Sequence, residues 1–337
     1  MKSILYIGNK LSQFGFTPGV IETLGGQLQD AGFTVSYAGT FKNQGLRLLQ
    51  ILYKTITKGR QADYILIDTY STKAFWYAYL AGRLARISGS KYILILHGGN
   101  LPARLIRSKR ACNKLFNGSY ANVAVSGYLQ HEFEKAGYST IVIPNNLDIS
   151  LYPFKKRENP RPKLLWVRSF HHQYNPNMAG DVLAGLIKEY PDSELCMVGP
   201  DKDGSMAEFK KYIKTKGIED HVTVTGRLPK SEWIKLSENY DFFINTTNVD
   251  NTPVSVIEAM ALGLCVVSTD PGGITWLLKD GKEALLVKPN NSTAMAGNIN
   301  HLIKNFGEAQ SLSVAARKKA ELFDWNVIKA SWFQLLS

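Results

Sequence analysis

The 337-residue chain has only three cysteines, Cys112, Cys196 and Cys265. They are widely spaced and form no CxxC pair, so neither a disulfide framework nor a zinc site is expected, and a reducing cytosol fits them. No run of 18 or more apolar residues occurs, so no transmembrane helix is expected. The apolar start, residues 3–8, is too short for a secretory signal and is typical of a first strand. These absences predict a cytoplasmic protein.

Several functional motifs are also missing. The loop after the first expected strand, residues 9–19, contains glycine but not the GxGxxG fingerprint of NAD-binding proteins. None of the common nucleic-acid-binding motifs appears, so no nucleic-acid partner is expected. His171 and His172 are metal ligands by type, but two adjacent histidines alone are more often polar loop residues. No metal and no cofactor is therefore expected.

The charge is positive and uneven. Lysine and arginine number 40 against 28 acidic residues, and residues 1–150 hold 17 of the former against 7 of the latter. Residues 151–337 are nearly neutral, with 23 against 21. A basic half beside a neutral half indicates that one domain meets an anionic surface or ligand.

Residues 46–58 read as a helix with two different sides. The basic side carries Arg47, Lys54 and Lys58. The opposite side is mostly apolar and carries Leu49, Leu52, Tyr53 and Ile56. A second basic group would share one broad face if helical: Arg104, Arg107, Arg110 and Lys114. Two interpretations stay open. In the first, the protein makes peripheral contact with an anionic membrane, at the inner face of the cell membrane. In the second, these residues form an ordinary solvated face on a core helix.

Short β-branched and aliphatic runs alternate with helical patterns along the whole chain. This alternation predicts an α/β fold with two doubly wound parallel-sheet domains, which also suits the chain length. The first set of expected strands is 3–8, 33–37, 64–68, 92–96, 123–125 and 141–143. The second set is 164–168, 194–198, 222–224, 242–245, 265–268 and 285–287.

The expected domain boundaries follow from composition. Residues 1–150 form an N-terminal domain and residues 163–324 a C-terminal one. Residues 151–162, rich in proline and charge, read as the linker. The tail, residues 325–337, is an aromatic-rich helix.

The most informative segment is 250–263, where a polar loop precedes a helix. Thr252 is a suitable helix cap and Pro253 suits the first helical position. The amides of Val254 and Ser255 would then point out of a helix N-terminus, which favours a phosphate. Glu258, and Asp250 eight residues before it, could accept hydrogen bonds from hydroxyls on either side of that phosphate. The pattern predicts a nucleotide-sugar pocket.

This segment, followed by residues 265–269 and by Pro271-Gly272-Gly273-Ile274, resembles family 4 of the retaining glycosyltransferases. That family has two acidic residues separated by seven, the second within an E-A-M-A-x-G helix start. The first is usually Glu, and here it is Asp250. The resemblance implies the GT-B fold, two Rossmann-like domains facing across a cleft, with the C-terminal helix crossing back onto the first domain.

The resemblance assigns the donor to the second domain. Arg168, at a strand end, suits a diphosphate because its planar fork binds phosphate oxygens in pairs. The family usually adds a lysine a few residues later; this chain has none there, and Lys202 is the candidate. Asp250 would hold the sugar hydroxyls and Glu258 the ribose. The remaining expected donor contacts are Gly226, Leu228, Asn251, Thr252, Pro253, Val254, Ser255, Gly272 and Gly273.

The first domain would bind the acceptor. His97 follows a strand at the position where family members commonly place a histidine near the sugar, and its expected role is electrostatic support of the transition state. The expected acceptor contacts are Gly15, Phe16, His97 and Asn100. His97, Asp250 and Arg168 are the expected catalytic residues. A satisfied structural histidine is the alternative for His97.

The predicted function is metal-independent, retaining transfer of a sugar from a nucleotide-diphosphate donor, most commonly a UDP-sugar. The predicted acceptor is a hydroxyl of a glycan or lipid-linked molecule, as in assembly of bacterial surface polysaccharide. Two alternatives stay open: a nucleotide-sugar epimerase of the same fold, and an inactive scaffold that binds nucleotide sugar.

Overall fold

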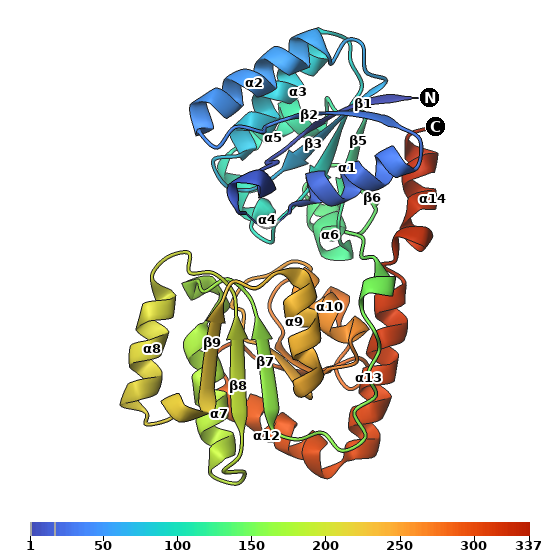
Figure 1. Cartoon of the computed structure of the whole chain (residues 1–337). Helices are drawn as coiled ribbons and strands as arrows, with labels where there is room; N and C mark the ends of the chain where they lie inside the picture. Colours follow the sequence, from blue (N-terminus) through green and yellow to red (C-terminus); the bar gives the residue numbers. More distant parts are fainter. Residues whose placement is uncertain (1, 17) are drawn as a thin grey trace. The chain divides into compact units, whose positions relative to one another are not determined.

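The computed structural model describes residues 2–16 and 18–337 of the chain. The chain divides into two compact units, and both ends of the chain belong to the same one (Figure 1). Unit 1 comprises Met1–Asn146 and Lys329–Ser337, and unit 2 comprises Leu147–Ile328. Within the described residues, no helix has the length and apolar character needed to cross a membrane.

Unit 1 is built on six parallel strands in the order β2-β1-β3-β4-β5-β6. The strands are β1 (Ser3–Ile7), β2 (Thr34–Ala38), β3 (Tyr64–Thr69), β4 (Tyr92–Leu96), β5 (Ala121–Ala124) and β6 (Ile141–Val142). The helices between them are α1 (Val20–Asp30), α2 (Gln44–Thr57), α3 (Phe75–Ile87), α4 (Leu101–Arg107), α5 (Lys109–Phe116) and α6 (Gly127–Lys135). Every residue of β3 and β4 is buried, as expected for central strands covered by helices on both faces.

The end of the chain is part of unit 1. Helix α14 (Trp325–Leu335) carries the buried side chains of Trp332 and, just beyond it, Leu336. The ring of Phe333 lies 5.9 Å from that of Phe33, centroid to centroid. The Tyr64 hydroxyl donates a hydrogen bond of 3.0 Å to the carbonyl of Ser337. Residues 329–337 therefore pack on the domain that opens the chain.

Unit 2 has six parallel strands in the order β12-β11-β10-β7-β8-β9. They are β7 (Lys163–Val167), β8 (Glu194–Val198), β9 (Val222–Gly226), β10 (Phe242–Asn245), β11 (Cys265–Thr269) and β12 (Leu285–Val287). The helices are α7 (Pro176–Ile187), α8 (Ser205–Thr215), α9 (Lys230–Leu236), α10 (Val254–Ala261), α11 (Ile274–Leu277), α12 (Ser292–Lys304) and α13 (Phe306–Glu321).

The two faces of this sheet carry separate hydrophobic cores, because side chains alternate along each strand. Leu164 and Trp166 of β7 pack in the core under α7, α8 and α12, with Phe209 of α8. Leu165, between them in sequence, packs in the core on the other face with Ile257 of α10. The predicted fold class, two doubly wound parallel-sheet domains of the GT-B type, is confirmed.

Residues 151–162 differ from the expected linker, because they pack within unit 2. Tyr152 is fully buried, and so is the guanidinium of Arg157. Arg157 donates hydrogen bonds to the carbonyls of Ser237 at 3.1 Å and Tyr240 at 3.3 Å. Backbone carbonyls thus accept hydrogen bonds from the Arg157 guanidinium, which composition alone predicted to be exposed to solvent.

The two basic helical patterns also differ from expectation. In α2 it is the basic side that turns inward: Arg47 is buried and donates to Asn9 Oδ1 at 2.7 Å, while Lys54 Nζ donates to the Tyr37 carbonyl at 2.6 Å. Lys58, at the C-cap of the helix, is exposed, and so are Leu49, Tyr53 and Ile56 of the apolar side. Residues 104–114 form two helices, α4 and α5, that meet at Ser108, so the second basic group does not share one helix.

All three cysteines are free and buried. Burial raises the pKa of Cys112 to about 11 and that of Cys265 to about 12, and it raises the pKa of Cys196 as well. Only a thiolate attacks a disulfide reagent, and at pH 8 almost none is present.

We therefore expect a coloured aromatic disulfide reagent to label no cysteine in the folded protein at pH 8 and all three after unfolding in guanidinium. Rapid labelling of a thiol in the folded state would contradict this burial.

Candidate functional site

The strand order of unit 2 reverses between β7 and β10, and ligands of doubly wound folds bind at the carboxyl edge beside such a switch point. Arg168 is the first residue after β7, and Asp250 lies in the loop after β10. Their side chains form an ion pair between Arg168 Nη2 and Asp250 Oδ2, and each is only 13% exposed. The guanidinium carbon lies 4.0 Å from the centroid of the Tyr174 ring. The structure thus brings together two residues predicted from sequence.

Opposing effects act on the pKa of the Asp250 carboxyl in this pair. Burial raises the pKa of Asp250, although the charge of Arg168 and the N–H of Asn251, 2.9 Å from Oδ1, both act to lower it. Arg168 Nε is buried and, among the described residues, has no acceptor. A largely buried guanidinium with a spare donor is well placed to bind an anion, because few waters compete there.

Hydrogen bonds join the loops that carry this pair. The hydroxyl of Thr246 donates to the carbonyl of Tyr174 at 2.7 Å. Asn248 N–H donates to the carbonyl of Gln173 at 2.8 Å, and the Gln173 side chain donates to the carbonyl of Val249 at 2.9 Å. The loops after β7 and β10 therefore hold each other, which fixes the positions of Arg168 and Asp250.

The Gly272-Gly273 turn lies against the Asp250 loop. Gly273 N–H donates to the Asp250 carbonyl at 3.0 Å, and a Cβ at position 273 would lie 2.1 Å from the Asn251 carbonyl oxygen. Gly272 has φ 56°, in the left-handed region. Only glycine at 273 allows this close approach.

Helix α10 begins at Val254, one residue later than expected, and its N-cap is Pro253. Thr252 does not cap it: no side chain forms a cap hydrogen bond at this end. The first helical bond runs from Val256 N–H to the Pro253 carbonyl at 3.1 Å, so the amides of Val254 and Ser255 precede the helical ladder. The predicted free amides are therefore present without the predicted threonine cap, because the proline already sets the entry of the chain.

Glu258 is buried in α10 and has two close partners. Its Oε1 accepts a hydrogen bond of 2.7 Å from the Tyr152 hydroxyl and lies 2.7 Å from Lys230 Nζ. Lys230 opens α9, shortly after Gly226 and Leu228, and its side chain is half exposed. Sequence reasoning missed Lys230. One feature of the sequence could have indicated it: Lys230 lies at the start of an expected helix, where the helix dipole disfavours a cation.

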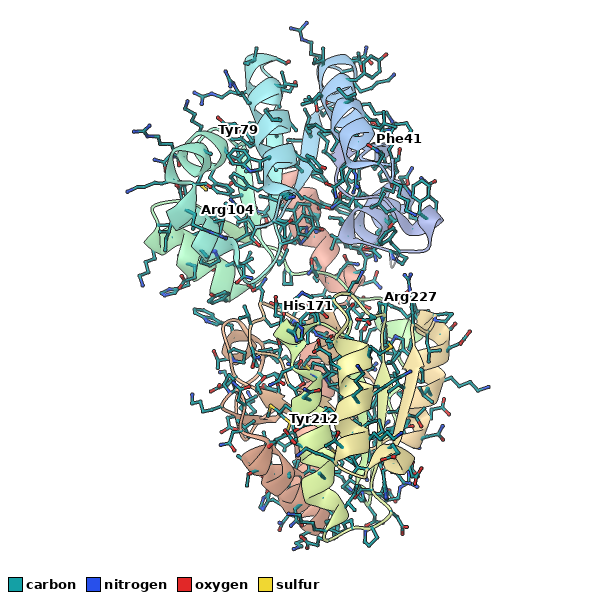
Figure 2. The ribbon with its side chains drawn as sticks, turned by 90° about the vertical axis from the view of Figure 1, so that its left-hand side faces the viewer. Phe41, Tyr79, Arg104, His171, Tyr212 and Arg227 are labelled. Carbon is teal, nitrogen blue, oxygen red and sulfur yellow. The ribbon has the colours of Figure 1, made fainter. Side chains whose placement is uncertain are left out.

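The turns after β8 and β9 hold the remaining predicted donor contacts. Gly226 has φ 69° and accepts a hydrogen bond of 2.8 Å from Gly199 N–H, and Leu228 packs on the core beneath α10. Lys202 has an exposed side chain, and its N–H donates to the Phe170 carbonyl at 3.0 Å. Figure 2 shows Arg227 and His171 at the same end of unit 2, where its strands end. The role expected of Lys202 stays a prediction.

Asp201 and Asp203 have the Asp-x-Asp spacing of metal-using transferases. Asp201 Oδ1 accepts from Gly204 N–H at 2.9 Å, and Asp203 Oδ2 accepts from His172 N–H at 2.9 Å. Burial opposes ionisation of Asp203, but its hydrogen bonds lower its pKa to about 2. His171 Nε2 lies 3.7 Å from the same carboxylate. These groups bind each other and their own turns.

In unit 1 the strand order reverses between β1 and β3, and a buried polar cluster lies there. His97 Nε2 lies 3.0 Å from Asp68 Oδ1, which also accepts a hydrogen bond of 3.1 Å from the Tyr6 hydroxyl. The Tyr70 ring stacks on His97 with centroids 5.0 Å apart. Burial raises the pKa of both tyrosines. Asp68 was missed, because inside an apolar run it reads only as the end of a strand.

Asp68 keeps unused bonding capacity. Its Oδ2 is buried and, in the part of the chain that the structure describes, has no hydrogen-bond partner. A Cβ at Gly8 would lie 2.5 Å from this oxygen, so glycine at the end of β1 allows the carboxylate its place. The cluster holds the imidazole of His97 in one orientation.

The loop after β1 carries two predicted acceptor contacts. Glu22 of α1 anchors it by accepting from Gly19 N–H at 3.0 Å and from the Ser12 hydroxyl. Gly15 has φ 80°, and Phe16 is 42% exposed, while Thr17 lies outside the described residues. Asn100 is the N-cap residue of α4 but makes no side-chain cap bond.

The family model of glycosyl transferases group 1 matches residues 148–319, just over half of the chain. The chain belongs to this family. The match covers the part of unit 2 that carries Arg168, Asp250 and Glu258.

Curated relatives are distant. The chain is 29% identical over 218 residues to the putative teichuronic acid biosynthesis glycosyltransferase TuaC of Bacillus subtilis, covering 61% of this chain and 53% of that protein. It is 22% identical to the phosphatidyl-myo-inositol mannosyltransferase of Mycobacterium leprae, covering 61% and 56%. The chain spans about half the length of the curated relatives that it matches.

Solved structures share the fold over the whole chain. The crystal structure of Anabaena Alr3699/HepE in complex with UDP and glucose matches with TM-score 0.78 and 20% identity, covering 100% of this chain and 99% of that one. Sucrose-phosphate synthase from Thermosynechococcus elongatus matches with TM-score 0.81 and 16% identity, covering 99% and 98%. At these identities the likeness shows the fold alone.

Replacing Gly273 by Ala should displace the Asp250 loop of this group 1 glycosyl transferase, because the new methyl meets the Asn251 carbonyl. With UDP, which the solved neighbour binds, as the probe, we expect the affinity to fall at least tenfold, about 1.4 kcal/mol, in isothermal titration. Gly297→Ala is the matched control: position 297 lies in α12 with open space around it, so this change should leave UDP affinity unchanged and stabilise the helix by about 0.5–1 kcal/mol. Equal UDP affinity in both variants would contradict this role of Gly273.

Proposed function

We propose that the protein is a retaining glycosyltransferase that moves a sugar from a nucleotide-diphosphate donor to a hydroxyl of a glycan or lipid-linked acceptor. The observation that carries the proposal is the buried Arg168–Asp250 pair at the switch point of unit 2. It shares its loop with the free amides of α10, and Glu258 lies in that same helix. Anion-binding donors and hydroxyl-binding carboxylates on adjoining segments match the two chemical halves of a nucleotide sugar.

In the proposed reaction, the bond between the anomeric carbon and the phosphate oxygen breaks, and a bond to the acceptor oxygen forms on the same face. The acceptor proton passes to the leaving phosphate. Negative charge grows on the diphosphate, where Arg168 and the amides of Val254 and Ser255 stabilise it. These groups act without a metal. Asp250 holds the sugar hydroxyls and Glu258 the ribose.

Lys230 adds a cation that the proposal can use. Its Nζ lies beside the carboxylate of Glu258 and its side chain is half exposed, so it could turn toward a bound diphosphate. Lys202 remains the other candidate for the second cation.

Unit 1 is proposed to bind the acceptor through Gly15, Phe16, His97 and Asn100. The Asp68–His97 contact supports this assignment, because a hydrogen-bonded carboxylate fixes the orientation of the imidazole.

UDP is the proposed carrier, and support comes from the fold neighbour in complex with UDP-glucose. A glycan or lipid-linked acceptor in bacterial surface polysaccharide assembly is supported by the names of the teichuronic acid and phosphatidyl-myo-inositol relatives. Peripheral contact with an anionic membrane belongs to the same proposal, because unit 1 carries most of the net positive charge.

The direct test incubates the protein with a set of UDP-sugars, each alone and with lipid-linked and soluble acceptors, and follows the anomeric proton by NMR. We expect an acceptor-dependent product with the donor's α configuration. An inverted product would refute retention. A changed sugar without acceptor would indicate an epimerase, and tight UDP binding with no turnover on any acceptor would indicate a scaffold.

Glu258→Gln should remove discrimination at the ribose. We expect the wild type to bind UDP about 10–100-fold more tightly than 2′- or 3′-deoxy-UDP, the value of a hydrogen bond to a charged group. The variant should lose most of that preference and nearly all turnover.

Glu283→Gln is the matched control, because Glu283 is an equally buried carboxylate of unit 2 within 4 Å of two lysines. It should keep the ribose preference. A Glu258→Gln protein that still distinguishes UDP from its deoxy analogues would overturn the assignment.

A further inference from the structure

One side of unit 1 is built from helices that have no acidic side chain. Between residues 31 and 131 the only acidic residues are Asp63 and Asp68, whereas 14 lysines and arginines lie there. Helices α2, α3, α4 and α5 contain none of the acidic residues. The surface of a soluble protein normally mixes positive and negative side chains. A face whose charged side chains are all positive therefore indicates an anionic partner.

A pocket of about 430 Å³ opens between α3 and α5 on this face. Its lining residues are Tyr79, Arg83, Arg86, Ile87, Lys114 and Leu115. Three of the six are cations, and in the described part of the chain none of these three has a carboxylate within 4.0 Å. Figure 2 shows Tyr79 on the helix layer of unit 1, with nitrogen-tipped side chains reaching outward beside it.

The pocket is separate from the His97 cluster. It lies at the ends of α3 and α5, which lead into the amino ends of β4 and β5. A Cβ at Gly118 would lie 3.4 Å from Arg86 Cδ and 2.7 Å from the Tyr92 hydroxyl, which places Arg86 beside the residue that opens β4. His97 follows the other end of that strand. The pocket is thus not part of the proposed acceptor site.

Large apolar side chains are exposed around these cations. Ile87, in the pocket wall, is 71% exposed, and Ile106 of α4 is 83% exposed. The outward side of α2, which packs beside α3, is apolar along its length and carries Leu46, Leu49, Tyr53 and Ile56, each at least half exposed. An exposed isoleucine in the same pocket wall as two arginines favours a ligand that has both an anionic head and an apolar body.

We propose that the pocket between α3 and α5 binds the phosphate group of an anionic phospholipid and docks unit 1 on the membrane surface. This proposal rests on the proposed function, which places the acceptor at a membrane, and adds to it a separate site with its own ligand. Arg83, Arg86 and Lys114 bind the phosphate oxygens, and Ile87 enters the boundary between headgroups and acyl chains.

The side-chain charges of the pocket provide the electrostatic part of this binding. Arg86 and Lys114 lie in the last turns of α3 and α5, where the helix carbonyls carry partial negative charge and repel an anion. Each basic side chain near an anionic bilayer strengthens binding roughly fivefold.

The test measures sedimentation of the full-length protein with vesicles of phosphatidylcholine alone and of phosphatidylcholine mixed with phosphatidylglycerol. We expect binding to the mixed vesicles only, weakened roughly 30-fold by Arg83→Gln with Arg86→Gln. The matched control is Lys210→Gln with Lys214→Gln, which removes the same charge from the exposed side of α8 in unit 2 and should leave binding within twofold.

A second pair of variants tests the apolar contact. Ile87→Ser should weaken vesicle binding about tenfold, whereas Leu322→Ser, at a position 62% exposed in unit 2, should not change it. In all variants, stabilisation by UDP should match the wild type, which shows that the protein is folded and that the donor site is intact.

Three results would overturn the proposal. The first is an equal loss of vesicle binding in the α3 double variant and its α8 control, and the second is equal binding to neutral and anionic vesicles. The third is displacement of the protein from vesicles by inorganic phosphate when the ionic strength is held constant. The last result would assign the pocket to a soluble phosphate compound. Lipid binding without UDP stabilisation would refute the proposed donor site while leaving this inference intact.

Discussion

The proposed function depends on one buried ion pair, Arg168 with Asp250. Two charges have been taken out of water, and each is compensated mainly by the other. Removing either partner would leave an unpaired buried charge, which costs about 3–5 kcal/mol. A diphosphate bound to Arg168 would replace Asp250 as its anion and free that carboxylate to accept hydrogen bonds from sugar hydroxyls. The pair therefore stabilises the fold, and in the proposed function it also occupies the position that the donor diphosphate would take.

The parallel sheets determine where such polar groups can gather. In both units the central strands are buried on both faces, so polar side chains can lie only where strands end. The strand order of unit 2 reverses between β7 and β10, and that of unit 1 between β1 and β3. Arg168 and the Asp250 loop follow the first pair of strands, and Asp68 is the last residue but one of β3 in the second pair. The same topological rule thus selects both polar clusters.

The sequence alone was sufficient for the regular elements and for part of the candidate site. Both ends of all twelve strands were predicted within two residues, because short apolar runs between glycine-rich turns are a strong signal. Arg168, Asp250, Glu258 and the glycine pair could be placed because they follow strands or lie in a recognisable helix start. What could not be predicted depends on contacts across the fold. Lys230 reaches Glu258, and Asp68 reaches His97, from segments far away in sequence.

Helix α2 illustrates the same limit for orientation. Its pattern has a basic side and an apolar side, and periodicity cannot say which one faces the protein. Uncharged oxygens of Asn9, Lys42 and Tyr37 accept hydrogen bonds from Arg47 and Lys54, so these two basic side chains turn inward and the apolar side turns outward. Likewise, Pro253 sets the start of α10 and leaves Thr252 without its expected role as a cap.

The most direct test of the central claim is a crystal structure of the protein with an intact UDP-sugar. The account predicts the diphosphate on Arg168 and on the first amides of α10, the ribose at Glu258, and the sugar hydroxyls at Asp250. An intact Arg168–Asp250 ion pair beside a UDP-sugar bound elsewhere in unit 2 would contradict it.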